Sequence, residues 1–350
     1  MNKLIIIAGI WFSVSGVFGQ TEVTTGISHG KDFGVVYMLP KTEIELEAKA
    51  IKVVYTPGKF SKYADRYLHQ TDISYEAEVY WLLTGVSVRT IGLPDKEQTY
   101  FVKMKDKSVA PLIELTADGI IKSINVPYER KQKENTITTI IPKKKKADPH
   151  SFFTEEISMT NSSAKMAELI AKEIYNIRES KNTLLRGQAE YIPQDGAQLK
   201  LMIDNLNEQE EALLTMFWGT EEREEKSYIF RITPNKEKEN EVVFRFSKKL
   251  GIVTADNLAG EPIYLNLKDL KSIIIPQQTK KKNEVDGIAY NVPGRAVMTL
   301  TKGTEILYKN EFPITQFGIV EYLASALFNS KSTIKVIFNE ITGGLTKVDR

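Results

Sequence analysis

Most of this chain consists of short segments rich in β-branched and aromatic residues, and this pattern constrains the fold more than any other sequence feature. In the first third, turn residues separate such segments at 35–39, 44–46, 51–55, 75–83, 86–91, 100–104 and 112–115. Asp118-Gly119 gives the clearest hairpin signal, because a type I′ turn needs positive φ at both central residues. A helix is expected here only over residues 61–69. We therefore predict a mainly antiparallel β unit.

Two amphipathic helices are predicted in the middle of the chain. The first follows a cap at Asn161 or Ser162, and its apolar residues recur three and four positions apart, namely Met166, Leu169, Ile170, Ile174 and Ile177. The second begins at Pro193. Its apolar face carries Leu199, Met202, Ile203, Leu206 and Leu213, and its other face is acidic. Together the two helices predict a helical hairpin.

Strand-like segments return after the hairpin, at 216–219, 228–232, 242–246, 263–267 and 273–275, with one short helix near 317–327. Residues 128–150 interrupt the pattern with charge and two prolines, and we place a boundary there. The predicted fold class is α+β, with two mainly antiparallel β units and a helical hairpin between them. The predicted domains are a signal peptide at 1–19, an N-terminal β domain at 20–150, the hairpin at 151–215 and a C-terminal β domain at 216–350.

The two β units show a faint internal repeat. Residues 34–55 align without a gap onto residues 287–308 at a constant offset of 253, with five of 22 positions identical. The identical pairs include Tyr37 with Tyr290 and Pro40 with Pro293. A weaker similarity pairs TADGIIK at 116–122 with ITGGLTK at 341–347. A diverged duplication explains these matches, and so does chance alignment of strands with similar composition.

The first nineteen residues have the form of an export signal. Lys3 supplies a positive start, an apolar stretch runs from Leu4 to Val17, and the end is suited to cleavage before Gln20. The stretch is too short to span the hydrocarbon core of a membrane comfortably. We therefore expect an exported protein of the periplasm or cell surface, with no transmembrane span after cleavage.

Composition excludes several classes of chemistry. The chain has no cysteine, which excludes disulfides, thiolate metal sites and a cysteine nucleophile. Its 47 basic and 45 acidic residues nearly balance, whereas nucleic-acid-binding proteins usually carry a basic excess. An exported chain without disulfides has to draw its stability from buried area.

Few residues form a constellation that suggests chemistry. Asp65 and His69 stand four apart in a possible helix, with Asp72 nearby, but we interpret them as a surface ion pair rather than a metal site. Ser332 and Lys335 match the S-x-x-K pattern of serine acyl transferases, yet the partner motifs are absent and the segment is predicted to be a strand. No metal, no cofactor and no catalytic or binding residue is assigned.

Lysine clusters and aromatic residues offer possible binding surfaces. The lysines at 143–146 and 280–282 could attract anionic lipid or polysaccharide, although such loops more often protect a sheet edge from aggregation. Five aromatic residues could stack on sugars if they were exposed together, although burial in the core is the simpler interpretation; they are Trp81, Phe217, Trp218, Tyr290 and Tyr308.

Several segments together resemble a known family. They are the export signal, YWLLTG, TMFWGTE, IELTADGIIKSIN, FRFSKKLGIV with NLAGEPIYL, and YNVP with FPITQFGIVEYL. With these, the mature chain resembles a family of uncharacterised exported proteins of Bacteroidetes bacteria, classed as a domain of unknown function. The resemblance implies a cell-envelope setting and supplies no site residues.

We expect a non-catalytic binding or structural module of the cell envelope, whose partner is an envelope protein or a glycan and not a nucleic acid. The alternative is a carboxylate-dependent hydrolase acting on envelope or dietary glycans. The 45 acidic residues allow many carboxylate pairs, but none stands out in the sequence.

Overall fold

Two very long antiparallel strands, β2 (Gly34–Thr56) and β3 (Glu78–Lys103), run through the centre of the molecule. The computed structural model describes residues 22–25, 34–103, 113–126, 147–190, 195–274, 287–324 and 334–349. The two strands belong to a sheet of order β1-β3-β2-β6, in which β1 spans Glu22–Thr25 and β6 spans Thr220–Ile232. At about 3.3 Å per residue, β2 alone is about 75 Å long.

The prediction of separate short strands in this region is wrong. Segments 35–39, 44–46 and 51–55 are one continuous strand, and segments 75–83, 86–91 and 100–104 merge into β3 from residue 78 to the limit of the described chain at 103. Pro40 lies opposite Pro94 beside a register shift, and Gly85 lies at a second shift, opposite Lys49. Because the two strands carry matching irregularities, they continue past residues that usually mark turns.

A second antiparallel sheet packs against the inner face of the first. Its order is β11-β10-β9-β7-β8, with bounds Glu305–Ala324, Gly287–Lys302, Glu261–Asp269, Lys238–Ser247 and Gly251–Val253. The main apolar core lies between the sheets, where Leu46 of β2 meets residues such as Leu265 and Met298, all fully buried. The rings of Phe230 and Phe244 stack across the two sheets with centroids 4.9 Å apart.

The helix predicted near residues 317–327 is wrong as far as the structure describes it. Residues 317–324 belong to β11, and Ile319 pairs with Val292 of β10. Pairing with a long neighbour outweighs the helix-like spacing of the apolar residues. The strand predicted at 273–275 is also absent from residues 273 and 274, while residue 275 lies outside the described chain.

A small third sheet joins two hairpins that are far apart in sequence. Its order is β13-β12-β5-β4, with bounds Leu345–Asp349, Lys335–Phe338, Ile121–Ile124 and Ile113–Leu115. The predicted hairpin at Asp118-Gly119 is confirmed, since β4 and β5 pair around it. The predicted type I′ turn is wrong, because Gly119 has a φ of +82° and Asp118 does not adopt positive φ. The three residues between Thr116 and Ile120 instead match the common loop that ends in a single left-handed residue.

The helices pack together into a helical head. It contains η1 (Ser61–Tyr63), α1 (Ala64–Leu68), η2 (Pro149–Phe152), α2 (Glu155–Met159), α3 (Ser163–Leu185) and α4 (Gly196–Trp218). A separate apolar core holds it together, centred on Phe60, Ile170 and Phe217. The helix predicted at 61–69 is confirmed as η1 and α1, which end at Leu68 with His69 as the C-cap.

The two long helices largely follow the prediction. The Ser162 hydroxyl caps α3 by accepting from the Lys165 N–H, as expected. Asp195 caps α4, and the predicted start at Pro193 lies outside the described residues. The strand predicted at 216–219 is wrong, because α4 continues to Trp218 and buries Met216 and Phe217 in the head. Among the helices of the described ranges, none is both long and apolar enough to cross a membrane.

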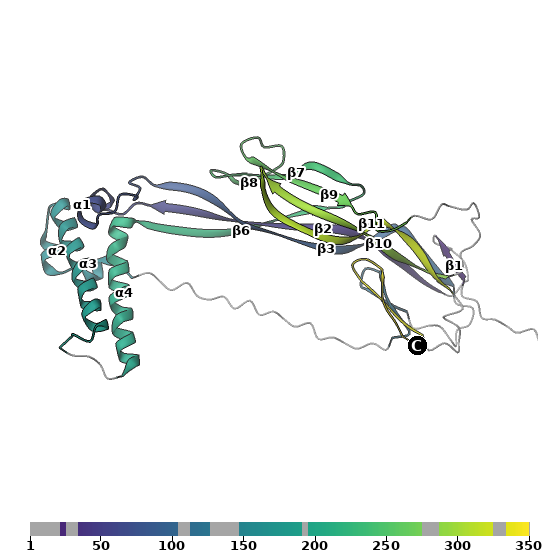
Figure 1. Ribbon diagram of the computed structural model, residues 1–350, viewed down its shortest axis with the longest axis horizontal. Helices are drawn as coiled ribbons and strands as arrows, with labels where there is room; N and C mark the ends of the chain where they lie inside the picture. Colours follow the sequence, from purple (N-terminus) through teal and green to yellow (C-terminus); the bar gives the residue numbers. More distant parts are fainter. Residues whose placement is uncertain are drawn as a thin grey trace, which may run out of the picture.

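The molecule is an elongated rod, with the helical head at one end and the two packed sheets, here called the body, at the other (Figure 1). A three-stranded ribbon joins them, made of residues 51–56 of β2, 78–82 of β3 and 220–225 of β6; we call it the neck. The helices thus lie between the β segments in sequence but at the end of the rod in space. Strand pairing also crosses the predicted domain boundaries, since β6 pairs with β2 and β12 with β5.

Candidate functional site

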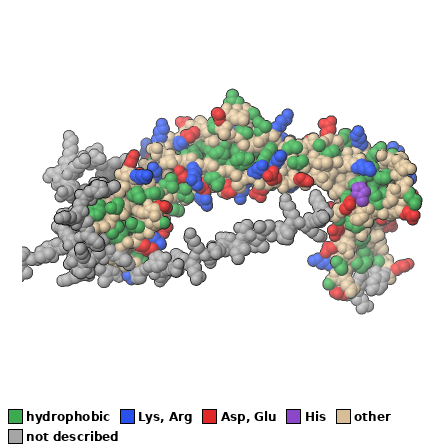
Figure 2. Space-filling model, turned by 180° about the vertical axis from the view of Figure 1, so that it is seen from behind, with side chains coloured by type: hydrophobic (Ala, Val, Ile, Leu, Met, Phe, Trp, Pro, Cys, Tyr) green, Lys and Arg blue, Asp and Glu red, His purple; other side chains and the backbone are tan. Residues whose placement is uncertain are grey.

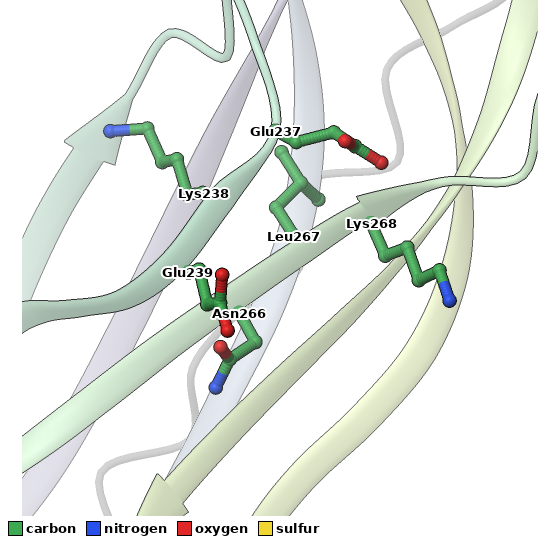
Figure 3. Close-up of a pocket in the computed structure, with 6 residues that line it drawn as sticks. All are labelled: Glu237, Lys238, Glu239, Asn266, Leu267 and Lys268. Atoms are coloured by element: carbon green, nitrogen blue, oxygen red, sulfur yellow. The ribbon is translucent and has the colours of Figure 1, made fainter.

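Open hollows with room for a small ligand lie at three places on the described surface. The first, of about 480 Å³, lies between β7 and β9 and is lined by Glu237, Lys238, Glu239, Asn266, Leu267 and Lys268. Figure 3 shows the carboxylates of Glu237 and Glu239 pointing in different directions on either side of Leu267. Two carboxylates so arranged do not face a common substrate, as glycoside hydrolysis requires.

The polar groups of this first hollow are largely committed to local structure. Glu237 Oε1 accepts the Asp269 N–H at 3.0 Å, and Asn266 Oδ1 accepts the Asn240 N–H at 2.9 Å. Lys238 pairs with Glu241 at 2.6 Å. These contacts hold the irregular pairing of β7 with β9, so the hollow is best explained as the consequence of a bulge.

The second hollow, of about 400 Å³, lies where β10 meets the turn between β12 and β13. Asn291 is buried there, and its Nδ2 donates to the carbonyl oxygens of Pro40 at 2.8 Å and Thr342 at 2.9 Å. Its backbone N–H donates to the Gly343 carbonyl at 3.1 Å. Asn291 thereby fastens three segments of the chain to one another, and its amide donors are used for structure.

The third hollow, of about 460 Å³, lies where the neck enters the body; we call it the Trp81 hollow. It is lined by Trp81, Leu82, Leu83, Phe246, Ser247, Lys248, Ala259, Glu261 and Lys302. These residues come from β3, from the end of β7 and the turn after it, from the start of β9 and the segment before it, and from the end of β10. Because both sheets contribute walls, the hollow exists only in the assembled body.

The β7–β8 turn holds Trp81 in place. The Trp81 backbone N–H donates to the Lys248 carbonyl at 2.8 Å, which ties β3 to the turn. The indole ring lies against Gly251, where an added Cβ would stand 2.8 Å from Trp81 Cδ2. Gly251 also has a φ of +80°, so the position favours glycine for two independent reasons. The Ser247 hydroxyl accepts from the N–H groups of Lys249 and Leu250 and completes the turn.

Lysine side chains lie over aromatic rings of the Trp81 hollow and of the neighbouring Tyr80. Lys302 Nζ is 5.6 Å from the centroid of Phe246, and Lys226 Nζ is 5.6 Å from that of Trp81. Lys248 Nζ is 5.4 Å from the centroid of Tyr80, just outside the hollow. Each distance is within the range of a cation–π interaction. Of these three lysines, Lys248 and Lys302 line the hollow itself.

The charges at this opening are only partly neutralised. Lys302 pairs with Glu261 at 3.1 Å and Lys226 with Glu224 at 3.4 Å. Lys248 is exposed and makes no ion pair within the described part of the chain. The pKa of Tyr80 is raised, first by burial and then by the negative charge of Glu221, so its phenol stays neutral. The site offers ammonium groups and apolar walls, with no paired carboxylates.

The sequence-predicted candidates lie elsewhere. The His69 N–H donates to the Asp65 carbonyl at 3.1 Å, and no ion pair joins these two described side chains, so that interpretation is wrong. No group of three metal-binding side chains occurs among the described residues. Lys335 begins β12, as the strand prediction for that segment implied, while Ser332 and both lysine runs lie outside the described chain.

The five aromatic residues are not brought together. Phe217 is fully buried in the head, while Trp218 is partly exposed there and donates its Nε1–H to Gln70 Oε1. Tyr290 lies beside the second hollow and Tyr308 stacks on Phe312. Among the five, only Trp81 contributes to the Trp81 hollow. Sequence reasoning missed Phe246, Lys248 and Lys302, because their contacts join strands far apart in the chain.

The carboxyl groups with altered acidity do not suggest a general acid. The pKa values of Asp148, Glu168, Glu210 and Asp256 are all lowered, chiefly through hydrogen bonds that these groups accept and, for Glu210, against the effect of burial. A glycosidase acid needs the opposite shift. The geometry therefore gives no support to the hydrolase alternative.

Comparison with known proteins gives a family but no activity. No curated protein and no solved structure matches the chain. A family model described as a domain of unknown function, DUF4831, matches residues 33–346, which include every described helix and strand except β1 and the end of β13. The chain therefore belongs to the family of the domain of unknown function DUF4831.

Proposed function

We propose that this protein is an exported, non-catalytic binding module of the cell envelope and that the Trp81 hollow takes an acidic glycan. One observation carries the proposal: Lys248 and Lys302 line one opening of about 460 Å³, and the ammonium group of each lies over an aromatic ring. Lysines fixed in this way lose less side-chain entropy on binding an anion than free surface lysines do.

The chemistry of the walls suits a sugar that bears carboxylate or sulfate groups. Lys248 and Lys302 can pair with the anionic groups, while the exposed side chain of Leu82 offers apolar contact to the sugar ring. Ligand pockets commonly combine an apolar wall with a few polar groups that set orientation. A site with ammonium groups and without paired carboxylates supports binding rather than hydrolysis.

The binding test uses the mature chain from Gln20 and an oligomer of a uronic acid, titrated by calorimetry at low salt. The variant Lys248→Gln with Lys302→Gln should weaken binding about tenfold or more, since it removes both ammonium groups. The control Lys236→Gln with Lys309→Gln has the same net charge but changes exposed lysines elsewhere, and it should bind like the parent. Added salt should weaken binding by the parent.

Three results would contradict this part of the proposal. The first is equal binding by the two double variants, and the second is equal affinity for a neutral oligosaccharide. The third is release of new reducing ends from the oligomer, which would show hydrolysis instead of binding.

Export is the second part of the proposal. It is supported by the sequence of residues 1–19, with Lys3 before an apolar stretch and a cleavage position before Gln20. N-terminal sequencing of protein recovered from the envelope fraction should begin at Gln20. An intact Met1 on protein from the cytoplasm would contradict it.

A diverged duplication is the third part. Residues 38 and 291 are equivalent at the offset of 253, and both donate a backbone N–H to a turn glycine: Met38 to Gly119 at 2.9 Å and Asn291 to Gly343 at 3.1 Å. Register shifts also flank the equivalent residues Pro40 and Pro293. A profile built from residues 34–55 of many family members should match residues 287–308 better than any other strand pair, and a better match elsewhere would contradict the duplication.

A further inference from the structure

The strand β11 forms a free edge of the second sheet. It is the last strand in the order β11-β10-β9-β7-β8, and in the described part of the chain it pairs with β10 alone. Its residues Lys309, Asn310, Glu311 and Pro313 are exposed. A strand edge with unpaired backbone groups is a template for another strand, and a proline in it limits how far such pairing extends. Residues 305–313 therefore form a surface to which a further strand can add.

The backbone groups that face outward from this edge follow from the pairing of β10. Arg295 of β10 lies opposite Pro313, and its carbonyl points away from β11, toward β9, where it accepts the Leu270 N–H at 2.9 Å. The direction of these groups alternates along an antiparallel pair. Pro313, Glu311 and Lys309 therefore direct their backbone groups to the free edge. The missing N–H of Pro313 accordingly costs β11 no hydrogen bond to β10.

The side chains along this edge are complementary to a second copy of themselves. They are arranged symmetrically about Asn310, with Lys309 and Glu311 on either side of it and Tyr308 and Phe312 beyond them. When two such strands pair antiparallel about Asn310, Lys309 of each copy faces Glu311 of the other. Tyr308 of each copy likewise faces Phe312 of the other. Opposite charges and aromatic pairs are both favourable across neighbouring strands.

We propose that β11 binds β11 of a second copy of this chain as an antiparallel strand, about a two-fold axis at Asn310. The same surface then serves both copies, as in most closed dimers. The backbone fits this register, because Lys309 and Glu311 both direct their groups outward and can exchange two hydrogen bonds. Pairing extends from Leu307 to Pro313. At its ends the Leu307 N–H donates to the Pro313 carbonyl, and the Leu307 carbonyl is left to water.

Other registers of the two strands are less favourable. An axis at residue 309 places Lys309 opposite itself, and an axis at 311 places Glu311 opposite itself, so that like charges meet. An axis at 308 places Glu305 opposite Glu311, with the same result. An axis at 307 pairs Glu305 with Lys309 but overlaps only residues 305–309 before the β10–β11 turn. An axis between two residues would set outward-facing backbone groups against inward-facing ones.

The overall charge permits two copies to associate. The formal net charge is only +2, and Figure 2 shows basic and acidic side chains interspersed along the body on the face seen from behind. Glu311 keeps its ion pair with Arg295 in the same copy. One local contact gives way: Asn310 Oδ1, which accepts the Glu311 N–H at 2.9 Å, is replaced by the carbonyl of the incoming strand. Because Asn310 is exposed, its amide then bonds to water.

A single cysteine tests the position of the axis, because the native chain contains none. Asn310→Cys should give a disulfide-linked dimer under mild oxidation, since the two copies of residue 310 form a non-hydrogen-bonded pair with Cα atoms about 4.5 Å apart. Glu305→Cys, exposed on the same strand, is the matched control and should stay reduced, because its two copies lie about 30 Å apart. Non-reducing electrophoresis measures both. Equal linking of the two variants, or no link in either, would overturn the proposal.

Charge reversal tests the facing pairs. Sedimentation velocity of the native chain should show a dimer. Lys309→Glu and Glu311→Lys, each alone, place like charges opposite each other and should raise the dissociation constant of the dimer about tenfold or more. Lys268→Glu changes an exposed lysine of β9 in the same sheet and should leave the constant unchanged.

A mixture of the two charge variants separates pairing from a general loss of stability. In an equimolar mixture of Lys309→Glu and Glu311→Lys, each strand again faces opposite charges, so dimers should form as in the native chain. A monomeric native chain would overturn the proposal, and so would a mixture that associates no better than its components. None of these readouts involves the Trp81 hollow.

Discussion

Thr42 of β2 and Thr315 of β11 exchange hydrogen bonds between the two sheets. The Thr42 N–H donates to Thr315 Oγ1 at 2.9 Å, and the Thr315 N–H donates to Thr42 Oγ1 at 3.1 Å. Gln316 adds a third link, since its Nε2 donates to the Thr42 carbonyl at 2.7 Å. Thr42 is fully buried, so the long strands are locked together where they cross near the end of the main core.

Replacement of Thr42 by valine should destabilise the protein by about 1–3 kcal/mol. Valine keeps the shape of the side chain but leaves the half-buried Thr315 N–H without its acceptor. Denaturant unfolding measures the change, with Thr304→Val at the exposed β10–β11 turn as control and an expected change below about 0.5 kcal/mol. Similar losses in the two variants would show that the exchanged hydrogen bonds contribute little.

Asn291→Ala should cost more, about 2–4 kcal/mol. The substitution removes the donor from two carbonyl groups at once, those of Pro40 and Thr342. Asn205→Ala, on an exposed face of α4, is the control and should change the free energy of unfolding little, because alanine is a better helix former. If both variants unfold at the same denaturant concentration, Asn291 does not fasten the segments as described.

The sequence predicted the kind of element well where the signal was local. The cap at Ser162, the hairpin at Asp118-Gly119 and the helix with its C-cap at His69 depend on residues a few positions apart. Strand length depended on distant partners. Nothing near Pro40 in the chain indicates that Pro94 lies opposite it, so a continuous strand was predicted as several.

The candidate site could not be predicted for the same reason. Trp81 meets Lys226, the Lys248 carbonyl and Gly251, all of which lie more than 100 residues further along the chain. In the sequence, each of these residues belongs to an unremarkable strand or turn. Only the packing of the second sheet on the neck end of the first brings them to one opening.

Gly251→Ala should destabilise the protein by about 2–4 kcal/mol and alter the environment of Trp81. An alanine there meets both the strain of φ near +80° and the indole ring. Gly303→Ala is the matched control, because Gly303 has a φ of +57° with nothing within 4 Å of an added Cβ. An alanine at 303 therefore meets the backbone strain but no steric contact. Denaturant unfolding measures the stability of both variants, and tryptophan fluorescence reports on the environment of Trp81. An unchanged spectrum in Gly251→Ala would contradict the packing described for Trp81.

Glu210 should make the stability of the helical head depend on pH. Burial raises the pKa of Glu210, but hydrogen bonds from Lys181 and Arg178 outweigh it and hold the pKa below the usual 4.5. A carboxylate with a depressed pKa stabilises the fold above pH 4.5, and this contribution is lost as the pH falls through the folded-state value.

Glu210→Gln should therefore lower the free energy of unfolding by about 1–2 kcal/mol at pH 7. The difference from the parent should shrink steadily below pH 4.5, whereas the exposed neighbour variant Glu211→Gln should show neither effect. Unfolding monitored by circular dichroism at 222 nm between about pH 3 and 7 tests this prediction. A constant difference between the parent and Glu210→Gln across that range would contradict the role of Glu210.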